Sequence, residues 1–105
     1  METMEKTYAG INLDLNEQGY LTNFNQWNKD VGLEIAKEEG IAMTNRHWDV
    51  IAYLQDQFKN EKPLSIRSVG KSGVVTIKEF YDLFPKGPLK ISSRIAGIPK
   101  PVSCI

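Results

Sequence analysis

The stretch Thr44-Asn-Arg-His-Trp-Asp-Val-Ile-Ala-Tyr-Leu-Gln-Asp-Gln-Phe-Lys59 predicts one long helix at the centre of the fold. Its first residue is of a type that caps helix N-termini, and the apolar residues after it recur at helical spacing. The expected apolar stripe consists of Trp48, Ile51, Ala52 and Phe58, widened by Val50 and Leu54. Because so wide a stripe must be covered on several sides, we expect this helix to form the core.

Four shorter helices are predicted around the central one. Their expected starts are Asn25, Pro63, the Thr76-Ile-Lys-Glu79 capping box and Gly87-Pro88. The first of these helices should end at Gly40 and the last at Gly97, because glycine favours helix C-termini. The third and fourth predicted helices of the chain, joined by a short glycine-containing turn, have a helix-turn-helix outline.

The N-terminal part predicts a small hairpin. Residues 10–15 alternate apolar and polar side chains, residues 16–19 carry a turn signal, and Tyr20-Leu21 starts a returning strand. The predicted fold class is therefore mainly α (α+β): a small orthogonal bundle of about five helices with an N-terminal β-hairpin. One domain is expected over 1–105, with residues 1–7 disordered, 8–22 the hairpin, 25–95 the helical core and 96–105 a flexible C-terminal arm.

Composition narrows the setting. No apolar run approaches the roughly 18 residues of a membrane helix, and the N-terminus lacks the apolar region of a signal peptide. A single cysteine cannot form an internal disulfide, so a reducing, cytoplasmic location is expected. The motifs of a self-contained enzyme, a metal site or a cofactor site are absent from the sequence.

Charge is balanced overall but unevenly distributed. Residues 1–61 contain five Lys/Arg and eleven Asp/Glu, whereas residues 62–105 contain eight Lys/Arg and two Asp/Glu. This asymmetry indicates either an acidic or nucleic-acid partner for the second half, or a solvated basic face. DNA binding by the helix-turn-helix pair has little support, because its second helix offers only Lys78 as a base.

The lone histidine is interpreted as structural. His47 falls in the first turn of the central helix, where the helix dipole disfavours the protonated form. A metal site would need further ligands nearby, which the sequence does not provide.

The C-terminal residues contain the single cysteine, which is the one reactive side chain left once enzyme, metal and cofactor motifs are excluded. Pro99 and Pro101 prevent a helix from continuing beyond Gly97, so an extended arm with Cys104 near its tip is predicted. At roughly 3.1 Å per residue, the segment from Gly97 to Cys104 could reach about 25 Å. Such a thiol could enter a partner's active site; the alternative interpretation is a frayed tail with an incidental cysteine.

Two motifs carry a resemblance to a known family. Leu83-Phe-Pro-Lys-Gly-Pro88 and Arg94-Ile-Ala-Gly-Ile-Pro-Lys-Pro-Val-Ser-Cys-Ile105 resemble the turn and the tail of the DsrC/TusE family. Upstream, Gly19-Tyr-Leu21, Trp27 and Thr44-x-x-His-Trp48 fit the same pattern, as Pro63-x-x-x-Arg67 does less closely. The resemblance covers roughly residues 10–105.

The resemblance implies a function. In this family the penultimate cysteine, here Cys104, carries a persulfide. TusE-type members receive sulfur from the TusBCD complex and deliver it, with the MnmA thiouridylase, to the wobble uridine of certain tRNAs. DsrC-type members instead serve dissimilatory sulfite reductase, and one-cysteine paralogues, including regulators, are a further alternative.

One departure favours the TusE type. DsrC proper has a second cysteine where this chain has Ser93. A hydroxyl cannot form a disulfide or trisulfide bridge, so a two-cysteine redox cycle is unavailable.

The predicted site thus combines a carrier residue with arm and docking residues. Cys104 accepts and donates sulfane sulfur. The arm residues are Gly97, Pro99, Lys100 and Pro101, and the residues expected to dock an acidic partner or stabilise the persulfide are Arg67, Lys90, Arg94 and Lys100. A sulfur carrier is the first hypothesis; a binding or regulatory protein and a structural domain with an incidental tail are the alternatives.

Overall fold

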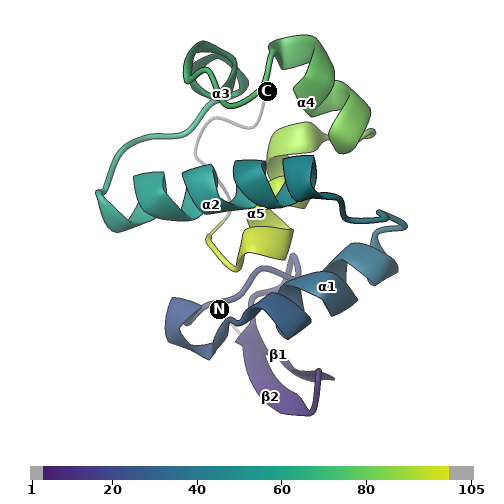
Figure 1. The fold of residues 1–105 in the computed structure, drawn as a ribbon. Coiled ribbons are helices and arrows are strands. Elements are labelled where there is room, and N and C mark those ends of the chain that lie inside the picture. The colour runs from purple at the N-terminus through teal and green to yellow at the C-terminus, as the bar shows by residue number, and fades with distance from the viewer. Residues whose placement is uncertain (1–3, 100–105) are drawn as a thin grey trace.

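The structure is a computed structural model, and it describes residues 4–99 of the chain. The described part contains a two-stranded antiparallel sheet and five α-helices, which confirms the predicted fold class. The elements are β1 (Met4–Tyr8), β2 (Ile11–Leu15), α1 (Lys29–Glu38), α2 (Asn45–Lys59), α3 (Ile66–Lys71), α4 (Ile77–Leu83) and α5 (Pro88–Ala96). In Figure 1, α2 and α5 lie at the centre, with α1 and the hairpin on one side and α3 and α4 on the other.

The hairpin uses a different partner strand from the one expected. β2 pairs with β1, in the register Tyr8↔Ile11, so residues 4–7 are a strand and the prediction that they are disordered is wrong. The two residues between the strands, Ala9 and Gly10, both have positive φ, the requirement of a tight primed turn. The expected returning strand at Tyr20-Leu21 is reduced to one isolated bridge, Leu15↔Leu21.

The first helix starts three residues later than predicted. Asn28, not Asn25, is the N-cap of α1, and its Oδ1 accepts a hydrogen bond from the Val31 N–H. Asn23 caps a separate 3₁₀ turn over Phe24–Gln26. Trp27 therefore lies before the helix, which frees its ring to reach another element. The helix end is as predicted, with Gly40 following at a positive φ.

The central helix spans the predicted range, but its buried face is narrower. Val50, Ile51 and Leu54 are buried, and Phe58 packs against this core at partial exposure. Ala52, placed in the stripe by prediction, is exposed, because the helical turn directs it away from the face that carries Val50 and Leu54. α2 packs mainly against α5, so only one side of the helix becomes core.

His47 is a structural residue, as predicted. It is buried in the first turn of α2, where its Nδ1 accepts a hydrogen bond from the Thr44 N–H at 3.0 Å. Its Nε2 lies 2.9 Å from the Leu83 carbonyl oxygen, the geometry of an Nε2–H donor. Both ring nitrogens are thus used to hold α2 against the end of α4.

The short helices α3 and α4 confirm the predicted pair with one shifted start. α3 begins at Ile66 after a reciprocal capping box between Ser65 and Ser68, so Pro63 lies in the preceding connection. The Thr76 side chain caps α4 by accepting from the Glu79 N–H, as expected. The Glu79 carboxylate does not complete a capping box; it binds Arg46 of α2 instead.

Helix α5 matches its prediction closely. Pro88 occupies its first turn and Gly97 its C-terminal cap, and its buried face includes Leu89, Ile95 and Ala96. It contacts α1, α2 and α4, so it links both sides of the fold. Within the described range of 4–99, no helix combines the length and the apolar character needed to cross a membrane.

Candidate functional site

The described part of the candidate site is the end of α5 at Gly97–Pro99, where the predicted C-terminal arm begins; we call it the arm root. Lys100, Pro101 and Cys104 lie outside the described residues 4–99, so the predictions for them stay predictions. Gly97 and Pro99 lie inside, at the C-terminal end of α5. The geometry of this helix end decides where the chain leaves the core.

Gly97 ends α5 in a Schellman arrangement. Its φ of 73° is left-handed, and its N–H donates to the Arg94 carbonyl while the Ile98 N–H donates to the Ser93 carbonyl. Ile98 is only 1% exposed, whereas Pro99 is exposed. The chain is therefore anchored up to Ile98 and reaches the surface at Pro99.

Two distant side chains complete this helix end. Trp27 donates from Nε1 to the Ile95 carbonyl oxygen at 2.7 Å, and Gln55 donates from Nε2 to the Ala96 carbonyl oxygen at 2.8 Å. These bonds satisfy carbonyls that a helix terminus leaves without intrahelical partners. The Trp27 ring also covers Gly97, where an added Cβ would lie 2.4 Å from its Cδ1 atom. The root of the arm is therefore held by α5, α2 and the segment before α1.

Sequence reasoning missed this contribution of Trp27 and Gln55. The predicted helix start at Asn25 places Trp27 inside a helix, and the family pattern that Trp27 fits does not indicate its partner carbonyl. Gln55 carries no local signal, because its partner carbonyl lies forty-one residues away.

Arg94 is committed to contacts within the fold. Its side chain is 12% exposed, and its Nε donates to the Gly19 carbonyl at 3.0 Å. Its terminal nitrogens bind the carboxylates of Glu38 and Glu39 and the hydroxyl of Tyr8. This arginine ties α5 to α1 and the hairpin, so the described geometry supports a positioning role.

Glu38 is the electrostatic counterpart of Arg94. Burial raises the pKa of this carboxyl, but hydrogen bonds from Lys6, Arg94 and Tyr8 outweigh that effect and lower the pKa to about 2. The carboxylate thus stays ionised across the physiological range and keeps the cluster together.

Ser93 is inaccessible from the solvent. Its exposure is 0%, and its Oγ has no hydrogen-bond partner among residues 4–99. Its neighbour Ser92, equally buried, donates to the Pro88 carbonyl at 2.5 Å. The position that resembles the second cysteine of DsrC is therefore filled by a small, enclosed hydroxyl.

Two further predicted docking residues lie on different helices, Arg67 on α3 and Lys90 at the start of α5. Both are exposed and form no ion pair within the described residues. Lys90 and Gly97 are separated by seven residues of helix, roughly 10 Å at the helical rise. The structure thus places Lys90 and the arm root at different ends of α5. A search of residues 4–99 finds no cluster of three or more His, Cys, Asp or Glu that could hold a metal ion.

Comparison with solved structures defines the class of protein. The NMR structure of Allochromatium vinosum DsrC matches with a TM-score of 0.83 and 32% identity, over 99% of this chain and all of that one. The crystal structure of the oxidized γ-subunit of the dissimilatory sulfite reductase (DsrC) from Archaeoglobus fulgidus matches with a TM-score of 0.82 and 34% identity, over 97% of this chain and all of that one. The described fold is the DsrC fold.

The sequence comparisons specify the family. A family model described as "DsrC like protein" matches residues 7–105, a range that includes Cys104. A curated relative named sulfurtransferase TusE, from Photorhabdus laumondii subsp. laumondii, is 38% identical over 93% of this chain and 96% of its own length. The chain belongs to the DsrC-like protein family and is similar to its TusE sulfurtransferases, which confirms the predicted resemblance.

Proposed function

We propose that this chain carries sulfane sulfur as a persulfide on Cys104 and passes it to a partner in a relay for tRNA wobble 2-thiouridine synthesis. The observation that carries the proposal is the family match through residue 105 together with close relatives named sulfurtransferase TusE. The expected partners are a TusBCD-like persulfide donor and a thiouridylase–tRNA complex, and the expected location is the cytoplasm. No cofactor takes part in the proposed transfer.

The proposed chemistry is two exchanges at sulfur. The Cys104 thiolate attacks the outer sulfur of a donor persulfide, a new S–S bond forms on Cys104, and the donor leaves as a thiolate. In the second exchange an acceptor thiolate attacks the outer sulfur of the Cys104 persulfide, and Cys104 leaves as a thiolate. Neither step changes the total number of electrons, so no external oxidant or reductant is needed.

The described structure supports this role through the anchoring of the arm root. Trp27, Gln55 and Gly97 hold the end of α5, so the residues that follow Pro99 start from a defined point of the surface. A carrier that must present one sulfur atom to two partners benefits from such a starting point, because a fixed origin limits the volume that the thiol searches.

Mass spectrometry tests the carrier step. After incubation with a persulfide donor, the wild-type chain is expected to gain about 32 Da, one sulfur atom, and Cys104→Ser to gain none. Ser103→Ala is the matched control, since it changes the neighbouring residue and keeps the thiol. Equal labelling of the wild type and Cys104→Ser would contradict the proposal.

Nucleoside analysis tests the pathway. In cells lacking the gene for this chain, tRNA 2-thiouridine is expected to fall, and to return with the wild type or Ser103→Ala but not with Cys104→Ser. Unchanged 2-thiouridine in the deletion would exclude the tRNA relay and leave the carrier step to be assigned to another pathway.

The second candidate function is partnership with dissimilatory sulfite reductase. It is favoured by the similarity to the Archaeoglobus fulgidus γ-subunit structure. Ser93 argues against a redox role there, because its enclosed hydroxyl cannot bridge to Cys104. Co-purification with sulfite reductase, with tRNA thiolation unaffected, would favour this candidate.

A further inference from the structure

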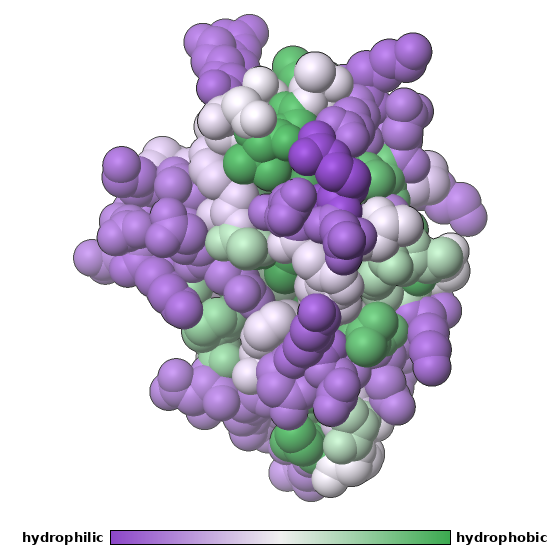
Figure 2. Space-filling model, viewed as in Figure 1, coloured by the Kyte–Doolittle hydropathy of each residue, from purple (hydrophilic) through white to green (hydrophobic). Residues whose placement is uncertain are grey.

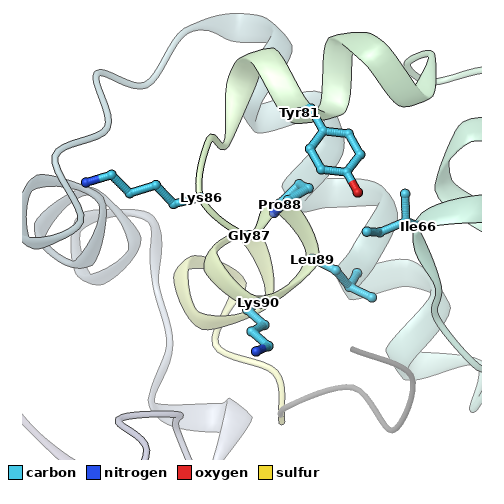
Figure 3. A pocket seen from close by; sticks show the side chains of 7 residues that line it. All are labelled: Ile66, Tyr81, Lys86, Gly87, Pro88, Leu89 and Lys90. Carbon is cyan, nitrogen blue, oxygen red and sulfur yellow. The ribbon is translucent and has the colours of Figure 1, made fainter. Parts of the chain in front are cut away.

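A groove between α3, α4 and α5 lies at the opposite end of α5 from the arm root. Its volume is about 340 Å³, and its walls combine apolar side chains with two basic ones, namely Ile66, Tyr81, Pro88, Leu89, Lys86 and Lys90. Figure 3 shows the Tyr81 hydroxyl directed toward Ile66, while the amino groups of the two lysines extend away from the apolar side chains. The groove thus has an apolar interior and a basic margin.

Helix α4, which contributes Tyr81 to this groove, carries two large apolar side chains that remain exposed. Tyr81 is 47% exposed, and Ile77, one turn earlier on α4, is 46% exposed. On the face shown in Figure 2, apolar side chains interrupt the hydrophilic surface in the region where α3 and α4 lie. Large apolar side chains that remain in water beside a groove mark a surface that another molecule covers.

The charge of the groove selects the kind of molecule. Lys86 and Lys90 are exposed and take part in no ion pair within residues 4–99. Helix α4 has two acidic residues. Glu79 is paired with Arg46, so Asp82 is set against the two lysines, and the net charge of the margin is positive. The margin is therefore positive and open to carboxylates, which suits an acidic partner segment.

The apolar interior favours a polypeptide over a nucleic acid. A single-stranded nucleic acid is held by several stacking rings and a continuous line of cations. Here the groove has one aromatic ring, that of Tyr81, and its hydroxyl is directed toward the aliphatic side chain of Ile66 (Figure 3). These contacts suit an aliphatic or aromatic anchor of a peptide.

We propose that this groove docks a short acidic segment of a sulfur-relay partner, with one apolar side chain beside Tyr81 and Ile66 and carboxylates at Lys86 and Lys90. The proposal rests on the proposed carrier function, since it assigns the groove to a partner of the relay. α5 is about 13 Å long at the helical rise, and an extended Gly97–Cys104 segment would reach about 25 Å. A partner held at the groove would therefore keep its reactive sulfur within reach of Cys104.

Peptide display provides a test with defined probes. A random library of peptides of about twelve residues is panned against the full chain, and enriched peptides are synthesised and titrated into ¹⁵N-labelled protein. The expected peptides contain Asp and Glu around one Leu, Phe or Trp, and they shift the amide signals of Ile66, Gly87 and Leu89. Their binding should weaken with added salt, because the margin contacts are exposed charges.

Variants localise the binding. Tyr81→Ser and Lys90→Glu should each weaken the peptide by about tenfold or more, whereas the control Lys37→Glu, an equal charge change on exposed α1 surface, should leave it unchanged. Lys90→Glu is expected to fold normally, because an acid in the first turn is favoured by the helix dipole. If Tyr81→Ser does not fold, the peptide affinity of Lys90→Glu alone tests the groove proposal.

Three results would overturn the groove proposal. The first is a library without enriched peptides, and the second is enriched peptides without net negative charge or with equal affinity for Lys90→Glu. The third is an oligouridylate that shifts the groove signals at lower concentration than the peptides. Each would show that an acidic polypeptide is not the occupant.

A separate readout distinguishes the groove from the carrier. Loading of Cys104 by glutathione persulfide, measured by mass, should be equal in the wild type and in the groove variants, because this small donor needs no docking. Peptide binding without loading of Cys104 would contradict the carrier function and support the groove as a docking site. Loading without peptide binding would support the carrier function and contradict the groove proposal.

Discussion

Gly97 holds a left-handed backbone against the side chain of Trp27. The positive φ and the close ring are two separate reasons for glycine at this position. Gly73 has a similar φ of 86° but no atom within 4 Å of an added Cβ. The two glycines therefore separate the cost of the backbone conformation from the cost of the contact.

Gly97→Ala is expected to destabilise the fold well beyond Gly73→Ala. The shared backbone cost is about 1 kcal/mol, and displacement of Trp27 should add about 2 kcal/mol at Gly97. Urea denaturation of both variants measures the difference in the free energy of unfolding. Equal losses would show that the Trp27 contact does not constrain the helix end.

Ser93 and Ser92 form a second pair of neighbours with contrasting environments. Both are fully buried, but only Ser92 has a hydrogen-bond partner among the described residues. A buried hydroxyl without a partner keeps its desolvation cost, about 1–3 kcal/mol. We infer that the fold tolerates the buried Ser93 hydroxyl because the serine side chain is small enough for the enclosed position.

Ser93→Ala is accordingly expected to raise the free energy of unfolding slightly or leave it unchanged, within about 1 kcal/mol. Ser92→Ala, which removes the bond to the Pro88 carbonyl, should lower it by about 1 kcal/mol. Thermal and urea unfolding of the two variants provide the comparison. A larger loss for Ser93→Ala than for Ser92→Ala would reveal a partner for the Ser93 hydroxyl.

At the scale of elements, local capping rules account for most helix ends. Thr76 caps α4, Pro88 starts α5 and Gly97 ends it, as their residue types predict. These rules need only a few adjacent residues, which is why they succeed without knowledge of the fold. They failed at two predicted starts. Asn28 caps α1 instead of Asn25, and Ser65 caps α3 instead of a start at Pro63.

The cluster around Glu38 joins α1, β1 and α5, and it makes the stability of the fold depend on pH. The Glu38 pKa of about 2 lies below its ordinary value, so its contribution is present above about pH 5 and is lost as the pH falls toward 2. Because its side chain is 35% exposed, solvent screening reduces the expected contribution to about 1 kcal/mol.

Glu38→Gln tests this linkage. The difference in the free energy of unfolding between wild type and variant should be about 1 kcal/mol at pH 7 and should vanish near pH 2. Glu17→Gln, a change at an exposed turn residue outside the cluster, is the control. A difference that is constant from pH 7 to pH 2 would mean that the Glu38 charge does not stabilise the fold.

At the scale of the whole molecule, two arginines connect the parts of the fold. Arg94 joins α5 to β1 through Tyr8 and to α1 through Glu38. Arg46 joins α2 to α4 through Glu79 and to the preceding connection through the Val74 carbonyl. They differ in burial: the Arg94 side chain is 12% exposed and that of Arg46 48%. The buried connection is expected to dominate, because solvent screens the exposed one.

Arg94→Gln should therefore cost about 3 kcal/mol, since it leaves Glu38 and Glu39 without their partly buried cation. Arg46→Gln should cost under about 1 kcal/mol. Urea denaturation measures both, and hydrogen exchange should show faster opening of β1 and β2 amides in Arg94→Gln than in Arg46→Gln. Equal protection of the hairpin in the two variants would contradict this connecting role.

The sequence by itself determined the helical class, most helix ends and the family, because these depend on residue types at short spacing and on motifs such as Arg94–Ile105. The role of Cys104 as the sulfur carrier is proposed from the same motif. Only the tertiary structure decided that β1 pairs with β2, that Ala52 faces outward and that Arg94 points into the fold. It also brought Trp27 and Gln55 to the carbonyls of α5. Such contacts join residues that are far apart in the chain, so local patterns do not encode them; packing and the need to satisfy buried polar groups select them.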